Sequence, residues 1–225
     1  STAEYNVAIG TTALDAVTTG DRNVAIGYDA LTANTTGGYN TAVGYESMNA
    51  NTTGGYNTAV GYGSMKYNTT GERNNAFGVQ SMIYNTTGGN NTASGFQSLK
   101  SNTTGSNNTS VGHQSLNSNT TGARNTGTGY QAAYTTTTGN DNTSIGYEAG
   151  NVITTGSQNV TIGSGSDPSA VAASNQIVIG YGAAGHGDNI SVIGNTDMTA
   201  WHPADDGGVD LGSSSYEFKD LYVDG

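Results

Sequence analysis

The sequence predicts an all-β protein, a parallel β-solenoid or β-roll of about eleven coils of 17 residues each. One observation behind this prediction is a series of eleven glycines spaced by 17 residues without an insertion or deletion. The other is a short run of alternating β-branched and small residues before most of them. A constant period is typical of stacked repeats, each packed on the last. We call these the anchor glycines: Gly10, Gly27, Gly44, Gly61, Gly78, Gly95, Gly112, Gly129, Gly146, Gly163 and Gly180.

The first element expected in each unit is a short strand that ends at the anchor glycine. In the unit 40–56, Thr41, Ala42 and Val43 precede Gly44. This period-two alternation favours a strand. Because successive side chains of a strand point to opposite faces, we expect Val43 to face the interior and Ala42 to face outward. A column of such small outward residues would form a seam between subunits, which predicts a homo-oligomer.

The second element expected is another short strand, which carries an apolar residue four positions after the anchor glycine, Met48 in this unit. A Thr-Thr-Gly turn then closes the unit at Gly54. We expect the glycines at both corners to supply backbone angles that other residues resist. Successive coils would pair in parallel about 4.8 Å apart, so eleven coils predict a rod of roughly 50 Å.

An asparagine recurs four residues before the anchor glycine in almost every unit. Stacked asparagines form hydrogen-bonded ladders along parallel coils, so we interpret this column as structural rather than catalytic. The expected ladder includes Asn40, Asn57, Asn74, Asn91 and Asn108.

Composition excludes several function classes. The 225 residues include 35 glycines, no cysteine and a net charge of −11. Without a basic stripe, binding of nucleic acid is not expected. The sequence contains no run of 18 apolar residues, so insertion into a membrane is not expected. No catalytic motif or metal-binding nonapeptide is present, so we expect no enzyme, no metal and no cofactor.

The repeat resembles known surface fibres. The strand pattern Asn-x-Ala-[Ile/Val]-Gly resembles the heads of trimeric autotransporter adhesins, although their coils are usually nearer the 14-residue step between Gly180 and Gly194. The longer form that ends in Asn-Thr-Thr-Gly looks more like repeats in bacteriophage tail fibres. The segment 210–225 resembles the stretch that precedes the self-cleaving intramolecular chaperone domain of many phage fibres and tailspikes.

This resemblance implies a structural fibre segment of a phage virion that takes part in host attachment. Its partners would be other copies of itself in a homotrimer, a host cell-surface glycan or protein, and other virion tail proteins. The alternative is a trimeric adhesin head on a bacterial surface. A further alternative is a tailspike that depolymerises glycans, for which Asp29 and Glu46, 17 residues apart, would supply the carboxylates.

Candidate contact residues lie where the repeat varies, because variation on a constant scaffold leaves the fold intact. The densest non-consensus patch predicts a receptor contact and consists of Lys66, Tyr67, Glu72, Arg73, Ile83 and Tyr84. The residue after the anchor glycine is usually tyrosine, and this column would either stack on sugar rings or pack at a subunit seam. His113 lies in that column and is interpreted as a ring that replaces a ring.

The sequence divides into a repeat region, 1–194, and a C-terminal segment, 195–225, which we expect to cap the open end of the solenoid. Acids at Asp205, Asp206 and Asp210 favour a solvated loop over a cation site. Large apolar residues would form a trimer clamp, consisting of Trp201, Tyr216, Phe218 and Tyr222.

Overall fold

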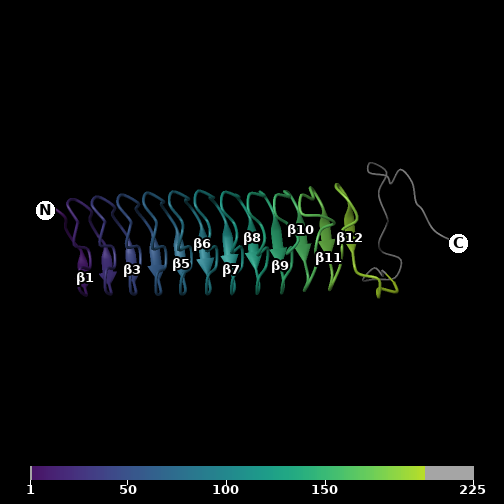
Figure 1. The fold of residues 1–225 in the computed structure, drawn as a ribbon, viewed down its shortest axis with the longest axis horizontal. Helices are drawn as coiled ribbons and strands as arrows, with labels where there is room; N and C mark the ends of the chain where they lie inside the picture. The colour runs from purple at the N-terminus through teal and green to yellow at the C-terminus, as the bar shows by residue number, and fades with distance from the viewer. Residues whose placement is uncertain (1, 201–225) are drawn as a thin grey trace, which may run out of the picture.

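A computed structural model describes residues 2–200 and confirms the parallel β-solenoid (Figure 1). Within these residues, twelve strands of three residues form one sheet, in which each strand pairs with the next along the chain. The strands are β1 (Val7–Ile9), β2 (Val24–Ile26), β3 (Thr41–Val43), β4 (Thr58–Val60), β5 (Asn75–Phe77), β6 (Thr92–Ser94), β7 (Thr109–Val111), β8 (Thr126–Thr128), β9 (Thr143–Ile145), β10 (Val160–Ile162), β11 (Ile177–Ile179) and β12 (Ser191–Ile193).

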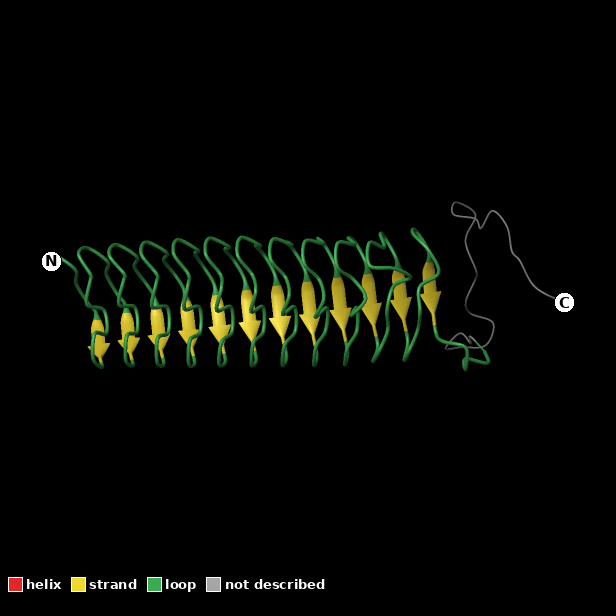
Figure 2. Ribbon diagram, in the orientation of Figure 1, coloured by secondary structure: helices red, strands yellow, loops and turns green. Residues whose placement is uncertain are grey.

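The strands pair in parallel and in the register of the repeat. Residue Thr41 lies opposite Thr58, and Ala42 lies opposite Ala59. The last step is shorter, so Ile177 lies opposite Ser191. Figure 2 shows the strands as a row along the rod, with loops completing each coil. Each 17-residue unit therefore forms one coil, as predicted.

The prediction of two strands per coil is wrong, because the described residues hold one strand per coil. The opposite side of the coil contains residues in the left-handed region, such as Glu46 with φ of 52° and Met48 with φ of 51°. These angles break the extended conformation that a strand requires. The coils still bond to each other there, since Met48 N donates to Ser64 O at 3.0 Å.

The expected inside and outside faces of the strand are reversed. Ala42 is fully buried, whereas Thr41 and Val43 are only half-buried. The coil is narrow, and the long side chain of Met48 fills it from the opposite side. Only a small residue then fits between that side chain and the strand. The alanine column therefore belongs to the core, and the seam hypothesis built on it is wrong.

The two glycine columns are required for different reasons. The anchor Gly44 has φ of 140°, a backbone conformation that suits glycine. The turn glycine Gly54 has no left-handed φ, which corrects the expectation of special angles at both corners. A Cβ at Gly54 would lie 2.6 Å from Asn51 Oδ1, so it is lack of space that requires glycine there.

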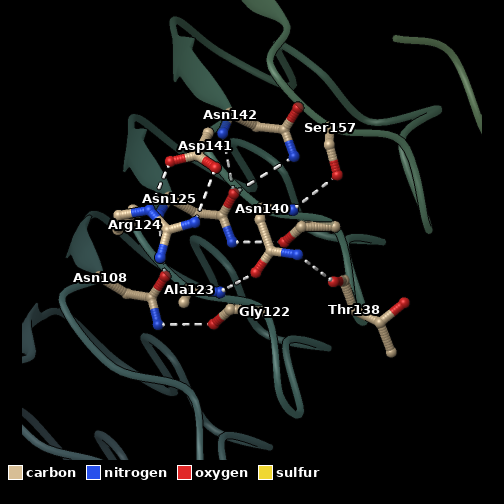
Figure 3. A network of polar contacts seen from close by, with 11 residues as sticks. Asn108, Gly122, Ala123, Arg124, Asn125, Thr138, Asn140, Asp141, Asn142 and Ser157 are labelled. Atoms are coloured by element: carbon tan, nitrogen blue, oxygen red, sulfur yellow. Dashed lines mark hydrogen bonds and ion pairs between the residues drawn. The ribbon is translucent and has the colours of Figure 1, made fainter.

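The predicted asparagine ladder is present and buried, from Asn23 to Asn159. In each step the side-chain oxygen accepts from the backbone of the next asparagine, as in the 2.9 Å bond from Asn74 N to Asn57 Oδ1. The side-chain nitrogen donates to a turn glycine, as from Asn74 to Gly88 O at 2.8 Å. Figure 3 shows these contacts around Asn125. The ladder thus joins amides to backbone groups, which explains why asparagine recurs there.

A second asparagine ladder starts each Asn-Thr-Thr-Gly turn and was not predicted. Its amides bond directly to one another, as in the 2.7 Å bond from Asn68 Nδ2 to Asn51 Oδ1. Asn68 Nδ2 also donates to Gly71 O at 3.1 Å, the carbonyl that Asn57 Nδ2 reaches at 2.8 Å. Both ladders therefore converge on the turn glycine. The signal for this ladder is the same 17-residue period, since an asparagine begins most of the turns.

Candidate functional site

The residues after the anchor glycines form an exposed column of stacked rings. The centroids of Tyr28 and Tyr45 lie 5.1 Å apart, and those of Tyr45 and Tyr62 lie 5.3 Å apart. All three rings are exposed within this chain. Further along, Phe96, His113, Tyr130 and Tyr147 stack in the same way. The ring faces inside these stacks are covered by their neighbours, so a ligand can reach only their edges or the end of a stack.

His113 lies between two rings of this column, 5.1 Å from Phe96 and 5.2 Å from Tyr130. The histidine occupies the position of a stacked ring, as its place in the repeat predicted. His186 lines a pocket of about 380 Å³ beside Val192 and Ile193. Within residues 2–200, no three histidine or acidic side chains gather as metal ligands would.

The predicted contact patch separates into two sets of contacts. Tyr67 stacks on Tyr84 with centroids 5.5 Å apart, and Lys66 Nζ lies 5.4 Å from the centre of the Tyr67 ring. Ile83 is 7% exposed in this chain, so its side chain offers little contact surface. The two exposed tyrosines and the half-buried Lys66 form one cluster beside the core.

The other two patch residues, Glu72 and Arg73, belong to a column that follows the Thr-Thr-Gly turns. Arg73 lies over Tyr56, with its guanidinium carbon 5.7 Å from the ring centre. Tyr56 stacks on Tyr39 at 4.8 Å, and Arg22 Nη1 donates to the Tyr39 hydroxyl at 3.1 Å. A shallow groove of about 310 Å³ runs beside these rings, and its lining includes Asp21, Gly38, Gly55 and Glu72.

The candidate carboxylates Asp29 and Glu46 have other partners. Glu46 forms a salt bridge with Lys66, whose Nζ lies 2.7 Å from Glu46 Oε2. This hydrogen bond raises the pKa of Lys66. Asp29 Oδ1 accepts a hydrogen bond from the Thr12 hydroxyl. The column position does bring both acids onto neighbouring coils, but each is engaged in a structural contact between coils.

A second charged pair joins neighbouring coils near the turn corner. Arg124 Nε lies 2.6 Å from Asp141 Oδ1, and Nη2 lies 2.8 Å from Oδ2 (Figure 3). The hydrogen bond from Arg124 lowers the pKa of Asp141. Beside this pair, Asn140 Oδ1 accepts from Ala123 N at 2.9 Å. The contacts are exposed, so they contribute modestly to stability.

The last coils of the repeat carry a different polar arrangement. A hydrogen bond between Tyr147 and the Glu148 carboxylate raises the pKa of the Tyr147 phenol. Burial raises the pKa of Asp167, whose Oδ1 accepts from Val152 N at 3.0 Å. These residues were not predicted as site residues, and the departure of the sequence after Gly146 from the repeat consensus was the available signal.

The remaining sequence hypotheses concern residues outside the described range. Asp205, Asp206 and Asp210 lie there, as does the expected trimer clamp of Trp201, Tyr216, Phe218 and Tyr222. In the part of the chain that is described, no helix is long and apolar enough to cross a membrane. No family model, curated protein or solved structure matches this chain.

Proposed function

We propose that this chain is a non-enzymatic structural segment of a bacteriophage tail fibre that takes part in host attachment. The observation that carries the proposal is the unbroken sheet of twelve in-register strands, which makes an extended rod from one short motif. Both asparagine ladders run along this rod and couple the coils without a thick core. A rod of this kind suits a part that holds a contact surface away from a particle, and the repeat motifs resemble those of phage fibres.

Attachment is tested with the purified chain, labelled fluorescently and incubated with a panel of bacterial strains. We expect saturable binding to a few strains, competed by unlabelled chain. Absence of binding to every strain of the panel would contradict attachment. The reading frame after residue 225 distinguishes the phage fibre from the bacterial adhesin. A chaperone domain there supports a phage fibre, whereas a membrane-anchor barrel supports the adhesin.

The proposal includes a homotrimer, which requires a contact surface other than the alanine column. The outer face of the sheet carries exposed apolar residues, among them Phe77, Val111 and Ile145. Burying such residues between copies would favour association.

Light scattering should give three times the chain mass, and the double variant Val111→Glu with Ile145→Glu should have a lower mass in solution. Thr87→Glu, at an exposed turn position, serves as the control. A monomer of the unaltered chain would contradict the trimer.

The depolymerase alternative has one direct test. Host capsule or lipopolysaccharide is incubated with the chain, and released oligosaccharides are measured. We expect none, because Glu46 is held by Lys66 and Asp29 by Thr12. Release that disappears in Glu46→Gln would favour the enzyme.

A further inference from the structure

The aromatic column contains one position where a small side chain lies between two tyrosines. Tyr147 follows β9, Ser164 follows β10 and Tyr181 follows β11, so the three residues lie on consecutive coils (Figure 1). Gly165 N donates to Tyr147 O at 2.8 Å, and Gly182 N donates to Ser164 O at 2.8 Å. These backbone bonds keep the coil spacing unchanged through the position of Ser164.

The gap above Ser164 is about one ring thick. Tyr130 and Tyr147 stack with centroids 5.1 Å apart, so two coil steps place the Tyr147 and Tyr181 rings about 10 Å apart. A ring between them would sit at the column's own spacing from both faces. Exposure agrees with an uncovered ring on the far side of the gap, since Tyr181 is 76% exposed whereas Tyr130 inside its stack is 42% exposed.

The neighbouring column also loses its side chains here, which widens the gap. A chain of amide hydrogen bonds runs through Gln80, Gln97, Gln114 and Gln131. Glu148 takes the next position, and Gly165 and Gly182 follow it. A Cβ at either of these two glycines would meet no atom within 4 Å. The space beside Ser164 is therefore open to solvent.

A comparison within the same column shows that this gap is specific. Val79 also interrupts the rings, between Tyr62 and Phe96. Its branched side chain occupies that position, and Gln80 lies in the next column, where Ser164 has Gly165. The protein thus has two interruptions, one narrowed by the Val79 and Gln80 side chains and one at Ser164, where Gly165 leaves the next column without a side chain.

We propose that the gap between Tyr147 and Tyr181 binds one uncharged pyranose ring of a glycan. A pyranose has apolar C–H faces, which fit against two aromatic faces, and a rim of hydroxyl groups. The residues beside the gap carry partners for that rim: the Ser164 hydroxyl and the Glu148 carboxylate, which also accepts a hydrogen bond from Tyr147. Glu148 and a net charge of −11 disfavour acidic sugars. This proposal rests on the proposed attachment function in one respect only, which is that the sugar comes from the surface of a host cell.

The binding test uses saturation-transfer NMR on the full chain with the methyl pyranosides of glucose, galactose and N-acetylglucosamine. We expect transfer from the protein to the ring C–H protons of at least one of them. p-Cresol is the competing aromatic probe. If p-cresol binds at this position and none of the three pyranosides does, the gap is a site for aromatic groups and the proposal is overturned.

Matched variants locate the site. Ser164→Tyr completes the stack and should reduce the transfer at least tenfold. Its circular dichroism spectrum and Tm should be the same as those of the unaltered chain, which shows that the variant is folded. Tyr181→Ala, which removes one face, should have the same effect on binding. Val79→Tyr fills the other interruption and should leave transfer unchanged. Equal transfer in the unaltered chain and in Ser164→Tyr would overturn the proposal, as would loss of transfer in Val79→Tyr.

Cell binding separates this proposal from the attachment function. If pyranosides bind the gap but the chain attaches to no host strain, the sugar site stands and attachment fails. If attachment is the same in Ser164→Tyr, and none of the three pyranosides binds, attachment stands and the sugar site fails.

Discussion

The coils from β2 to β7 and the coils from β9 to β11 follow the same backbone period but fill their interiors differently. In the first group a buried leucine or methionine four residues after the anchor glycine packs against a small strand residue, as Met65 does with Ala76. In the second group the larger residue is on the strand: Thr161 and Val178 are fully buried there. The position that faces Thr161 is Gly150, where a Cβ would meet Thr161 Oγ1 at 2.9 Å.

This comparison shows that the coil path and the side-chain packing are specified separately. The anchor glycines keep a left-handed φ of 131° to 140° in both groups, from Gly27 to Gly180. The interior volume is instead shared between facing columns, so a large residue in one permits a small residue in the other. The polar ladders differ as well, because the second ladder ends at Asn119, whose Oδ1 has no partner.

The largest expected effect is a loss of stability when a crowded anchor glycine is replaced by alanine, compared with the same replacement at an open glycine of the last coils. In Gly78→Ala, the new Cβ would lie 2.5 Å from Gly95 O at a φ of 132°. We expect a loss of more than about 4 kcal/mol in the free energy of unfolding, measured by urea denaturation. The matched Gly165→Ala has φ of 64° and open space, so it should cost about 1–2 kcal/mol. Equal losses would show that crowding between coils does not matter.

In the second ladder, an asparagine in the middle should contribute more to stability than the asparagine at the end. In Asn68→Ala, Asn85 Nδ2 loses its 2.7 Å bond to Asn68 Oδ1, and Gly71 O loses one of its donors. We expect a cost of about 2–4 kcal/mol from buried groups left unpaired. Asn119→Ala removes an oxygen that bonds to nothing, so it should cost about 1 kcal/mol less. Thermal unfolding of both variants measures the difference; an equal loss would contradict the ladder account.

Extending that ladder by one coil should stabilise the protein. Thr136 follows Asn119 in the column and its buried hydroxyl has no partner either. In Thr136→Asn, the new amide can donate to Asn119 Oδ1 as the other ladder amides do. We expect a gain of about 0.5–1.5 kcal/mol, visible as a higher urea midpoint. Thr87→Asn, at an exposed turn position, should change little. A lower midpoint in Thr136→Asn would mean that the last coils cannot accept the ladder.

The smallest effect concerns the half-buried Asp167 of the last coils. Burial raises its pKa in the folded chain, so the folded state disfavours the charged form. Its contribution to stability is therefore present below the unfolded pKa of about 3.9 and is lost as the pH rises through the folded pKa. Asp167→Asn should be more stable than the unaltered chain at pH 7 and equal to it at pH 3. Asp15→Asn, at an exposed position, is the control, and a pH-independent difference would contradict the assignment.

The sequence predicted much of the fold and little of the site. The 17-residue period identified the coil, and the asparagine column was correctly interpreted as a ladder because identical residues must stack when coils repeat. The contact patch around Tyr67 and Arg73 stays a prediction, since side-chain variation shows where recognition can lie but not what is recognised. The gap at Ser164 could not be found from composition, because it depends on which columns face solvent together.

By itself, the sequence determined the period, the parallel stacking and the first asparagine ladder, because a constant period places identical residues one above another. Only the tertiary structure decided which side of the strand faces inward. Alternation along a strand gives two equivalent faces, and the choice depends on the volume supplied by Met48 and its counterparts across the narrow coil. The same packing decided that Ala42 lies in the core and that the ring column is exposed.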